Sequence, residues 1–257
     1  MIKVFIAYIK FWLKSTNQHG VQSPFVYNFV TKCLYDKTNF NYYSKLKAYQ
    51  NTLKDNNTTI EINDLGAGSK VTRSNIRKIS SIAKNVGTTP FRARLLCRVV
   101  HYFEFETILE LGTSLGIATH AMHFGNPNAH ITTVEGCSNI SAFTKNSFKQ
   151  FNLKNIDVIT GDFNEVIQNL PSHNFDLIYF DGNHQKEATL NYFESLLKTT
   201  HNDSVFIFDD IYWSKGMTEA WEFIKQHPKV TVTIDTFFWG FVFFRKEQSK
   251  EHFIIRV

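Results

Sequence analysis

Residues 107–122 decide the fold, and they read Thr-Ile-Leu-Glu-Leu-Gly-Thr-Ser-Leu-Gly-Ile-Ala-Thr-His-Ala-Met. An apolar run ends at Gly112, a short turn follows, and the small and apolar residues after Gly116 suit a helix. A strand, a glycine-bearing turn and a helix start form a unit that presents backbone N–H groups to a ligand. Glu110 stands near the strand end, where we expect its carboxylate to face whatever binds at the turn.

Two chemistries fit this turn. The run from Gly112 to Gly116 matches G-x-S-x-G, the nucleophile elbow of serine hydrolases, with Ser114 as the nucleophile. It also matches acidic-x-G-x-x-x-G, the nucleotide-binding turn of S-adenosylmethionine (SAM) methyltransferases. It is not G-x-G-x-x-G, which disfavours a dinucleotide-dependent oxidoreductase. The rest of the chain has to decide between hydrolase and methyltransferase.

Strand and helix patterns alternate after this stretch, which predicts an α/β fold with a doubly wound, mostly parallel sheet of seven strands. The link between the last two strands, 236–239, is too short for a crossover helix, so this pair is expected to be an antiparallel hairpin. The expected strands are 107–111, 130–135, 156–160, 175–181, 204–209, 230–235 and 240–245, and the expected helices are 116–124, 139–151, 163–170, 186–198 and 217–226. Residues 252–257 form a further extended piece that the pattern does not place.

The region before this series is basic and mainly helical. We expect residues 1–90 to act as a lid, cap or dimer contact and residues 91–257 to form the Rossmann-like domain. Residues 1–106 carry a balance of +10 and residues 107–257 a balance of −5. The basic part suits an acidic substrate, nucleic acid or anionic lipid, or simply attracts the acidic part.

Two segments of the basic part carry alternative interpretations. Residues 1–15 have apolar residues at helical spacing with lysines opposite, which predicts a helix that covers its own domain or lies on a membrane surface. A second glycine turn, Gly66 to Gly68, is interpreted as a tight loop or as a pocket wall near the cofactor.

Composition excludes several classes of protein. The three cysteines are scattered and form no C-x-x-C, so a disulfide framework or a zinc site is not expected, and a reducing, cytoplasmic location is the default. No run approaches about 18 uninterrupted apolar residues, so no transmembrane segment is expected.

The order of acidic residues favours the cofactor interpretation. The hydrolase needs an Asp and then a His after Ser114, and Asp209 and His227 supply them. However, an elbow strand normally lies in mid-sheet, whereas this strand opens the series. A bound ribose needs a carboxylate at the end of the next strand, where Glu135 stands. Asp162 and Phe163, after the third strand, offer adenine a polar contact and an apolar wall.

These pieces together resemble the class I SAM-dependent methyltransferases over residues 107–245. The matching motifs are Leu-Glu-Leu-Gly-Thr-Ser-Leu-Gly, Val-Glu-Gly, Thr-Gly-Asp-Phe and Phe-Asp-Leu-Ile-Tyr-Phe-Asp-Gly. The resemblance implies that Glu110, Gly112 and Gly116 shape the SAM turn, that Glu135 holds ribose and that Asp162 faces adenine. The full predicted cofactor set is Glu110, Gly112, Thr113, Ser114, Gly116, Glu135, Gly136, Asp162, Phe163 and Asp181.

Within that class the chain looks most like the small-molecule O-methyltransferases related to catechol O-methyltransferase. That subgroup binds a divalent cation through residues that match Asp181, Asp209 and Asp210, so Mg²⁺ or another divalent cation is implied. Asp210 replaces the subgroup's Asn, and His184 stands where it usually has Lys. The predicted catalytic residues Asp181, His184 and Asp210 therefore act around a metal, or with His184 as general base, or are helix caps and a solvated side chain.

The sequence leaves the acceptor open. A small molecule methylated on oxygen is the leading prediction, and a homodimer is possible. The segment 181–184, Asp-Gly-Asn-His, is not the Asn/Asp-Pro-Pro-aromatic box of base N-methylation. An RNA-directed methyltransferase that uses the basic N-terminal part and a serine hydrolase at Ser114 remain as alternatives.

Overall fold

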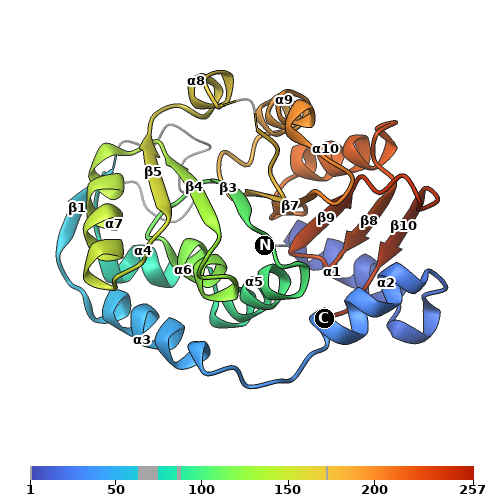
Figure 1. Cartoon of the computed structure of the whole chain (residues 1–257), viewed down its shortest axis with the longest axis horizontal. Helices are drawn as coiled ribbons and strands as arrows, with labels where there is room; N and C mark the ends of the chain where they lie inside the picture. The colour runs from blue at the N-terminus through green and yellow to red at the C-terminus, as the bar shows by residue number, and fades with distance from the viewer. Residues whose placement is uncertain (1, 63–74, 86–87, 172) are drawn as a thin grey trace. The chain divides into compact units, whose positions relative to one another are not determined.

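The computed structural model describes residues 2–62, 75–85, 88–171 and 173–257 (Figure 1). The chain divides into two compact units. One comprises Met1–Asp36 together with Ile167–Val257, and the other comprises Lys37–Val166. Both ends of the chain thus belong to one unit. The expected domain boundary at residue 90 stays a prediction, and neither unit begins or ends there.

The unit Lys37–Val166 begins with helices. They are α3 (Tyr42–Asp55), α4 (Ile79–Asn85) and α5 (Pro90–Phe103), and a short antiparallel pair, β1 (Thr59–Glu61) and β2 (Ile76–Lys78), precedes α4. Helix α5 starts where its sequence dictates, because the Thr89 hydroxyl accepts a hydrogen bond from the backbone N of Arg92 and Pro90 occupies the first turn. The glycine turn at Gly66–Gly68 lies outside the described residues.

Three parallel strands form the sheet of this unit: β3 (Thr107–Leu111), β4 (His130–Glu135) and β5 (Ile156–Thr160). Helices α6 (Ile117–Gly125) and α7 (Ser138–Gln150) connect them, and α8 (Phe163–Gln168) follows β5. Leu111 pairs with Val134, and Glu135 pairs with Thr160. Because the strands are parallel and in this register, the residues after all three strands meet at one edge.

The other unit holds five strands in the order β10-β8-β9-β7-β6. They are β6 (Leu177–Phe180), β7 (Val205–Asp209), β8 (Val232–Asp235), β9 (Trp239–Phe243) and β10 (Glu251–Ile254), with α9 (Lys186–Leu196), η3 (Leu197–Thr199) and α10 (Lys215–Gln226) between them. β6 and β7 are parallel, as are β8 and β10, and β9 runs antiparallel to both β7 and β8. β6 and β7 are buried along their whole length, which is why they read as unbroken apolar runs.

The β8–β9 hairpin confirms the prediction drawn from its short link. The link runs from Thr236 to Phe238, and Phe237 takes a left-handed φ of 74°. The Asp235 carboxylate stabilises this turn by accepting a hydrogen bond from the backbone N of Phe237 at 2.8 Å. A three-residue hairpin needs one left-handed residue, and here a phenylalanine supplies it.

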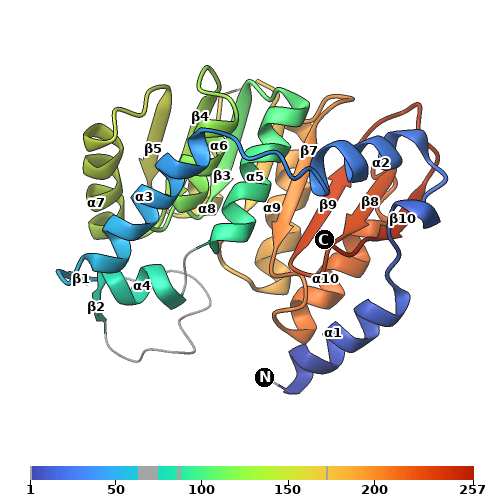
Figure 2. The same cartoon turned by 90° about the horizontal axis from the view of Figure 1, so that it is seen from below.

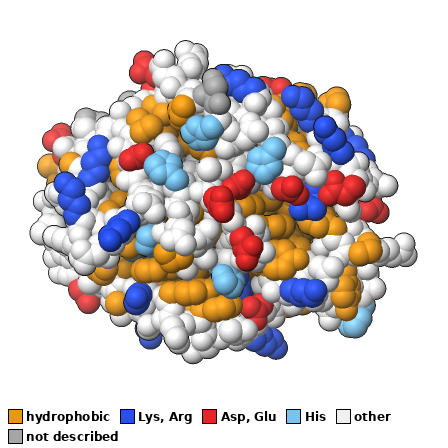
Figure 3. Space-filling model, viewed as in Figure 1, with side chains coloured by type: hydrophobic (Ala, Val, Ile, Leu, Met, Phe, Trp, Pro, Cys, Tyr) orange, Lys and Arg blue, Asp and Glu red, His pale blue; other side chains and the backbone are white. Residues whose placement is uncertain are grey.

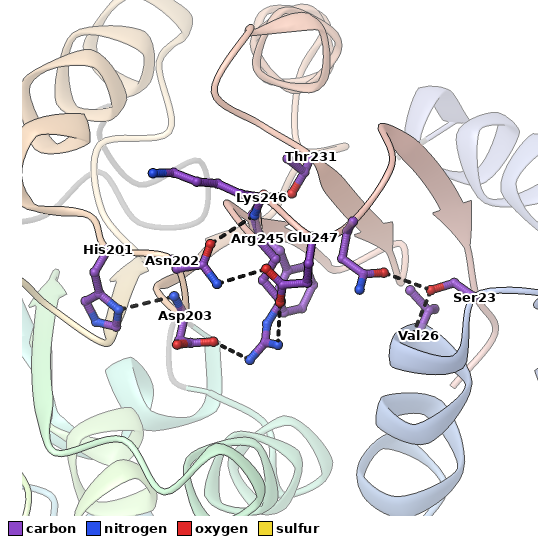
Figure 4. Close-up of polar contacts among 11 residues, drawn as sticks. Ser23, Val26, His201, Asn202, Asp203, Thr231, Arg245, Lys246 and Glu247 are labelled. Carbon is purple, nitrogen blue, oxygen red and sulfur yellow. Dashed lines mark hydrogen bonds and ion pairs between the residues drawn. The ribbon is translucent and has the colours of Figure 1, made fainter.

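The N-terminal helices pack on these C-terminal strands. They are α1 (Ile2–Lys14), η1 (Gln18–Gly20), α2 (Pro24–Phe29) and a single π-helical turn, η2 (Val30–Leu34). Ser23 caps α2 through the backbone N of Val26 and also donates to Gln248 at 3.3 Å (Figure 4). Phe29 packs edge-on against Phe241 and Phe243. The N-terminal helices therefore contribute to the hydrophobic core that covers the C-terminal strands.

A polar network fixes the loop after β9. The Arg245 guanidinium lies 2.5 Å from Asp203 and 3.0 Å from Glu247, and Asn202 bonds both Glu247 and the backbone N of Lys246 (Figure 4). The same guanidinium lies over the Phe25 ring, 4.7 Å from its centroid. The network ties the start of β7, the end of β9 and α2 together.

The predicted α/β fold, doubly wound and mostly parallel with an antiparallel hairpin, is confirmed. All seven expected strands and the five expected helices of residues 107–245 are present within a few residues of their predicted bounds. The strand count needs a correction, because β10 adds an eighth strand to the series that starts at β3. Among the described residues, no helix is both long and apolar enough to cross a membrane.

Candidate active site

The turn after β3 has a left-handed backbone at three positions. Gly112, Ser114 and Gly116 have φ values of 111°, 47° and 72°. The backbone N–H groups of Gly112 and Thr113 both donate to the Val134 carbonyl, at 3.0 and 3.1 Å. Glycine takes such angles freely, whereas a left-handed serine costs roughly 1–2 kcal/mol. Ser114 therefore needs contacts that hold it in place.

Glu135 supplies one of those contacts. One carboxylate oxygen accepts from the backbone N of Ser114 at 2.8 Å, and the other accepts from the backbone N of Cys137 at 2.9 Å. The carboxylate thus lies at the end of β4, beside the glycine turn, as the sequence predicted. Gly136 follows β4 directly and is partly exposed.

Three side chains hold the carbonyl groups of the turn. Thr144 of α7 donates to the Ser114 carbonyl at 2.8 Å, and the Tyr49 hydroxyl of α3 donates to the Leu115 carbonyl. His120 Nδ1 of α6 lies 2.8 Å from the Gly116 carbonyl. Because a carbonyl only accepts, Nδ1 of His120 carries the proton. The turn is therefore held by side chains from three helices.

Tyr49 and His120 also form a buried stack. Their ring centroids are 3.5 Å apart with an interplanar angle of 12°. Burial lowers the pKa of His120 to about 3 and raises the pKa of Tyr49 above its ordinary value, so both are neutral. Sequence reasoning missed this pair and Thr144. Tyr49 lies in a polar helix 66 residues before its partner Leu115, and no local pattern marks it.

Glu110 does not face outward as expected. It is fully buried, and one carboxylate oxygen accepts from Thr119 at 2.5 Å and from Thr133 at 2.6 Å. Its other oxygen has no hydrogen-bond partner within the described ranges. Burial is the main cause that raises the pKa of Glu110 to about 7, and the nearby charge of Glu135 adds to it. In this structure Glu110 supports the turn from beneath.

Asp162 and Phe163 lie where the sequence placed them, just after β5 and Gly161. One carboxylate oxygen of Asp162 accepts from the backbone N of Asn164 at 2.8 Å and of Glu165 at 3.4 Å, so Asp162 caps α8. Phe163 opens that helix and is partly exposed. The parallel register of β4 and β5 brings this segment next to Glu135.

The predicted catalytic residues lie in the other unit, after β6 and β7. His184 Nε2 is 3.9 Å from an Asp181 carboxylate oxygen, and both side chains are about one-fifth exposed. The Trp213 ring lies beside His184, with centroids 6.5 Å apart. Asn183 lies between Asp181 and His184 in the sequence. It takes a left-handed φ of 49° and donates to the Tyr192 hydroxyl. The structure therefore joins an acid, a histidine and an aromatic ring.

Asp209 ends β7, and Asp210 follows it. Asp209 is buried, and Asp210 takes a left-handed φ of 54° while its backbone N donates to the Phe238 carbonyl. Residues 2–62, 75–85, 88–171 and 173–257 contain no group of three His, Cys, Asp or Glu side chains placed to hold a metal ion. The donor set predicted for a cation, Asp181 with Asp209 and Asp210, is thus not gathered here.

An aromatic wall follows Asp210. Tyr212 stacks on Phe237, with centroids 5.1 Å apart, and its hydroxyl donates to the Asp235 carboxylate at 2.5 Å. Burial raises the pKa of both Tyr212 and Asp235. From the N-terminal helix, Tyr8 and Phe11 also pack against Phe237, with ring centroids 4.9 and 5.4 Å away. The aromatic cluster after β7 thus includes two rings of α1.

The comparisons with known proteins agree with this geometry. Residues 109–211 match the family model described as a methyltransferase domain. This match begins within β3 and ends just after Asp210, so it includes the glycine turn, Glu135, Asp162, Asp181 and His184. Among curated proteins nothing matches.

Several solved structures share the fold at low sequence identity. The O-methyltransferase TomG from Streptomyces achromogenes, solved with SAM, is 17% identical with a TM-score of 0.53, over 62% of this chain and 80% of that one. An O-methyltransferase from Bacillus cereus with S-adenosylhomocysteine (SAH) is 19% identical with a TM-score of 0.53, over 84% and 94%.

A third structure, the SAH-bound methyltransferase PaMTH1 of Podospora anserina, is 14% identical with a TM-score of 0.58, over 82% of this chain and 99% of that one. These likenesses establish the fold, and the family match establishes the domain. The resemblance inferred from the motifs is confirmed: the chain carries a methyltransferase domain in residues 109–211 and has the class I methyltransferase fold.

Proposed function

We propose that this protein transfers a methyl group from SAM to an oxygen atom of a small molecule. The observation that carries the proposal is the Glu135 carboxylate, fixed by the backbone N–H groups of Ser114 and Cys137 beside the left-handed glycine turn. The methyltransferase-domain match and the SAM- or SAH-bound structural neighbours support it.

The donor set fits an adenosyl group. The two Glu135 oxygens accept from the backbone N of Ser114 and of Cys137, and a carboxylate held in this way is the group that accepts from the hydroxyls of a ribose. Gly136, Asp162 and Phe163 follow adjacent strand ends, where a carboxylate oxygen and a partly exposed ring suit adenine. The predicted contacts of Gly112, Thr113, Ser114 and Gly116 with the cofactor belong to the same proposal. When bound, SAM supplies an electrophilic methyl group.

His184 acts as general base in this proposal. Its Nε2 faces Asp181, so Nδ1 is the nitrogen that takes the proton from an acceptor hydroxyl. The Asp181 carboxylate orients the ring and stabilises the imidazolium that forms. Trp213 and the Tyr212–Phe237 stack favour a flat, partly apolar acceptor. Asp210, with its left-handed φ and its backbone bond to the Phe238 carbonyl, shapes the start of the loop that carries Tyr212 and Trp213. A divalent cation stays a prediction, and the proposed proton transfer does not depend on one.

Calorimetry with SAM tests the cofactor part. Wild-type protein is expected to bind SAM, and Glu135→Ala to weaken binding about tenfold to a hundredfold, because two charge-assisted hydrogen bonds are lost. Glu165→Ala, which removes an exposed carboxylate of α8, is the matched control and should leave binding unchanged. Absence of heat with the wild-type protein would refute SAM binding.

Methyl transfer from radiolabelled SAM to a panel of catechols and phenols tests the base. His184→Gln should lower kcat by about 10²- to 10⁴-fold at unchanged SAM affinity. His130→Gln is the control, because His130 faces Asp157 at 3.1 Å in an exposed pair of the same type. Equal losses in the two variants would show that His184 is not the base.

The alternatives gain no support. His227, which the hydrolase needs, lies 3.7 Å from Glu194 and accepts from the backbone N of Lys229. On the face seen in Figure 3, lysine and arginine side chains are interspersed with acidic and hydrophobic ones, unlike a track for RNA. A homodimer stays a prediction.

A further inference from the structure

Helix α1 exposes an unusual amount of apolar surface. Among the described side chains of α1, only Phe11 is a large one that is less than one-tenth exposed. Phe11 and Tyr8 pack on Phe237. The side chains that point away are large and at least two-fifths exposed: Phe5 64%, Ile6 47%, Ile9 44%, Trp12 52% and Leu13 71%. Their spacing of three and four residues gathers them on one side of the helix. Only some of the apolar side chains of α1 therefore pack against the rest of its unit.

A row of positive charge borders this exposed face. Lys10 and Lys14 follow Ile6 at intervals of four residues, so the three lie in one line along the helix. Residues 2–14 include no aspartate or glutamate. Trp12, on the other border, lies under the Arg256 guanidinium at 5.6 Å. Apolar side chains with an aromatic ring and flanking cations are the composition of helices that lie in a membrane interface.

We propose that α1 docks this protein on an anionic lipid surface, with Phe5, Ile9 and Leu13 entering the headgroup region and Lys10 and Lys14 contacting lipid phosphates. Charge decides between a bilayer and a second copy of the chain. Two copies facing through α1 would bring their lysine rows together without an acidic partner on either helix, whereas anionic lipids neutralise them. This inference does not depend on the methyltransferase chemistry.

The helix is already held in position for such docking. Thr16, just after α1, donates its backbone N–H to the Ile254 carbonyl at 2.8 Å and accepts from the backbone N of Arg256 at 3.1 Å. With the Phe237 contacts, this anchors α1 at both its middle and its end. Figure 2 shows α1 at the margin of its unit with its outer side uncovered. Docking therefore needs no folding of a disordered segment, which would weaken it.

Sedimentation with sucrose-loaded vesicles tests the proposal on the full chain. Vesicles of phosphatidylcholine alone are compared with an equal mixture of phosphatidylcholine and phosphatidylglycerol. The wild-type protein should partition about tenfold or more strongly onto the anionic vesicles, since each lysine near the surface contributes severalfold. Phe5→Ser with Leu13→Ser should reduce partitioning about a hundredfold, about tenfold for each apolar side chain. Lys10→Glu with Lys14→Glu should abolish the preference for anionic vesicles.

The control is Phe223→Ser on α10, because Phe223 is 52% exposed and lies outside the proposed face. It should sediment like wild type, and circular dichroism should show native helix content for all variants. The proposal is overturned if wild type ignores anionic vesicles, or if Phe223→Ser loses as much binding as the α1 variant. It is also overturned if light scattering shows a wild-type dimer that Phe5→Ser with Leu13→Ser dissociates while vesicle binding is absent.

Discussion

Replacing Glu110 by Gln should change how the stability of the protein depends on pH. The Glu110 oxygen that accepts from Thr119 and Thr133 is replaced by an amide oxygen that accepts equally well. The amide nitrogen takes the place of the oxygen that has no partner in the described structure. That substitution carries a cost of its own, but the cost is the same at every pH. The readout is therefore the pH dependence and not the stability at one pH.

The sign and size follow from the pKa of Glu110. Burial raises it from 4.5 to about 7, so the folded protein keeps this proton when the unfolded chain has lost it. The carboxyl stabilises the fold fully below pH 4.5, and this contribution is lost as the pH rises through 7. The loss is about 3 kcal/mol, because each pKa unit corresponds to about 1.4 kcal/mol. Glu110→Gln does not titrate, so from about pH 4.5 to about pH 8 its stability relative to wild type should rise by about 3 kcal/mol.

Urea unfolding of wild type and Glu110→Gln at about pH 4.5 and about pH 8 gives the free energy of unfolding of each protein. The quantity compared is how the difference between the two proteins changes with pH. Far-UV circular dichroism is the probe, because all four tryptophans lie outside Lys37–Val166, at Trp12, Trp213, Trp221 and Trp239. Glu165→Gln on α8 is the control and should track wild type. A relative change below about 1 kcal/mol, or one of opposite sign, would refute a buried neutral carboxyl at the base of the turn.

Three further substitutions probe the packing. Tyr49→Phe removes the hydrogen bond to the Leu115 carbonyl and should cost about 1–2 kcal/mol in urea unfolding, with weaker SAM binding by calorimetry; equal SAM affinity would show that the turn does not need this bond. Gly116→Ala places a Cβ 2.6 Å from Phe148 in a backbone of φ 72°, and should cost at least about 2 kcal/mol. A thermal scan in which the Gly116→Ala variant matches wild type would contradict this packing. Arg245→Ala breaks the partly exposed pairs with Asp203 and Glu247 and should cost only about 1 kcal/mol, and urea unfolding in high salt should show a smaller cost.

The sequence predicted the strands and helices of residues 107–245 well because buried parallel strands leave a simple signal. β6 and β7 are apolar runs without a polar break; Asp181 directly follows β6, and Asp209 is the last residue of β7. β10 gave no such signal, since Glu251 and His252 are exposed and the strand is only four residues long. Its place depends on pairing with β8, which local composition does not encode.

The candidate site was predictable to the level of strand ends and no further. The position of Glu135 follows from chain order, and its two backbone partners lie close to it or to the glycine turn in sequence. The inward direction of Glu110 depends on the hydroxyls of Thr119 and Thr133, which one sequence does not mark as its partners. The side chain of Tyr49 reaches the turn from a separate helix, and such long-range contacts have no period or spacing to read.

The backbone of Thr16 is hydrogen-bonded to Ile254 and Arg256, so the segment after α1 is joined to the segment that follows β10. Tyr35 strengthens this connection by donating to the Arg256 carbonyl at 2.6 Å. Removing residues 251–257 would expose the edge of β8 that pairs with β10. It would also remove the backbone hydrogen bonds that hold Thr16, and with it the end of α1, in place. Tags and fusions at the carboxy terminus should therefore be joined through a flexible spacer, and a protease that nicks this tail should promote edge-to-edge aggregation before the remainder of the fold is lost.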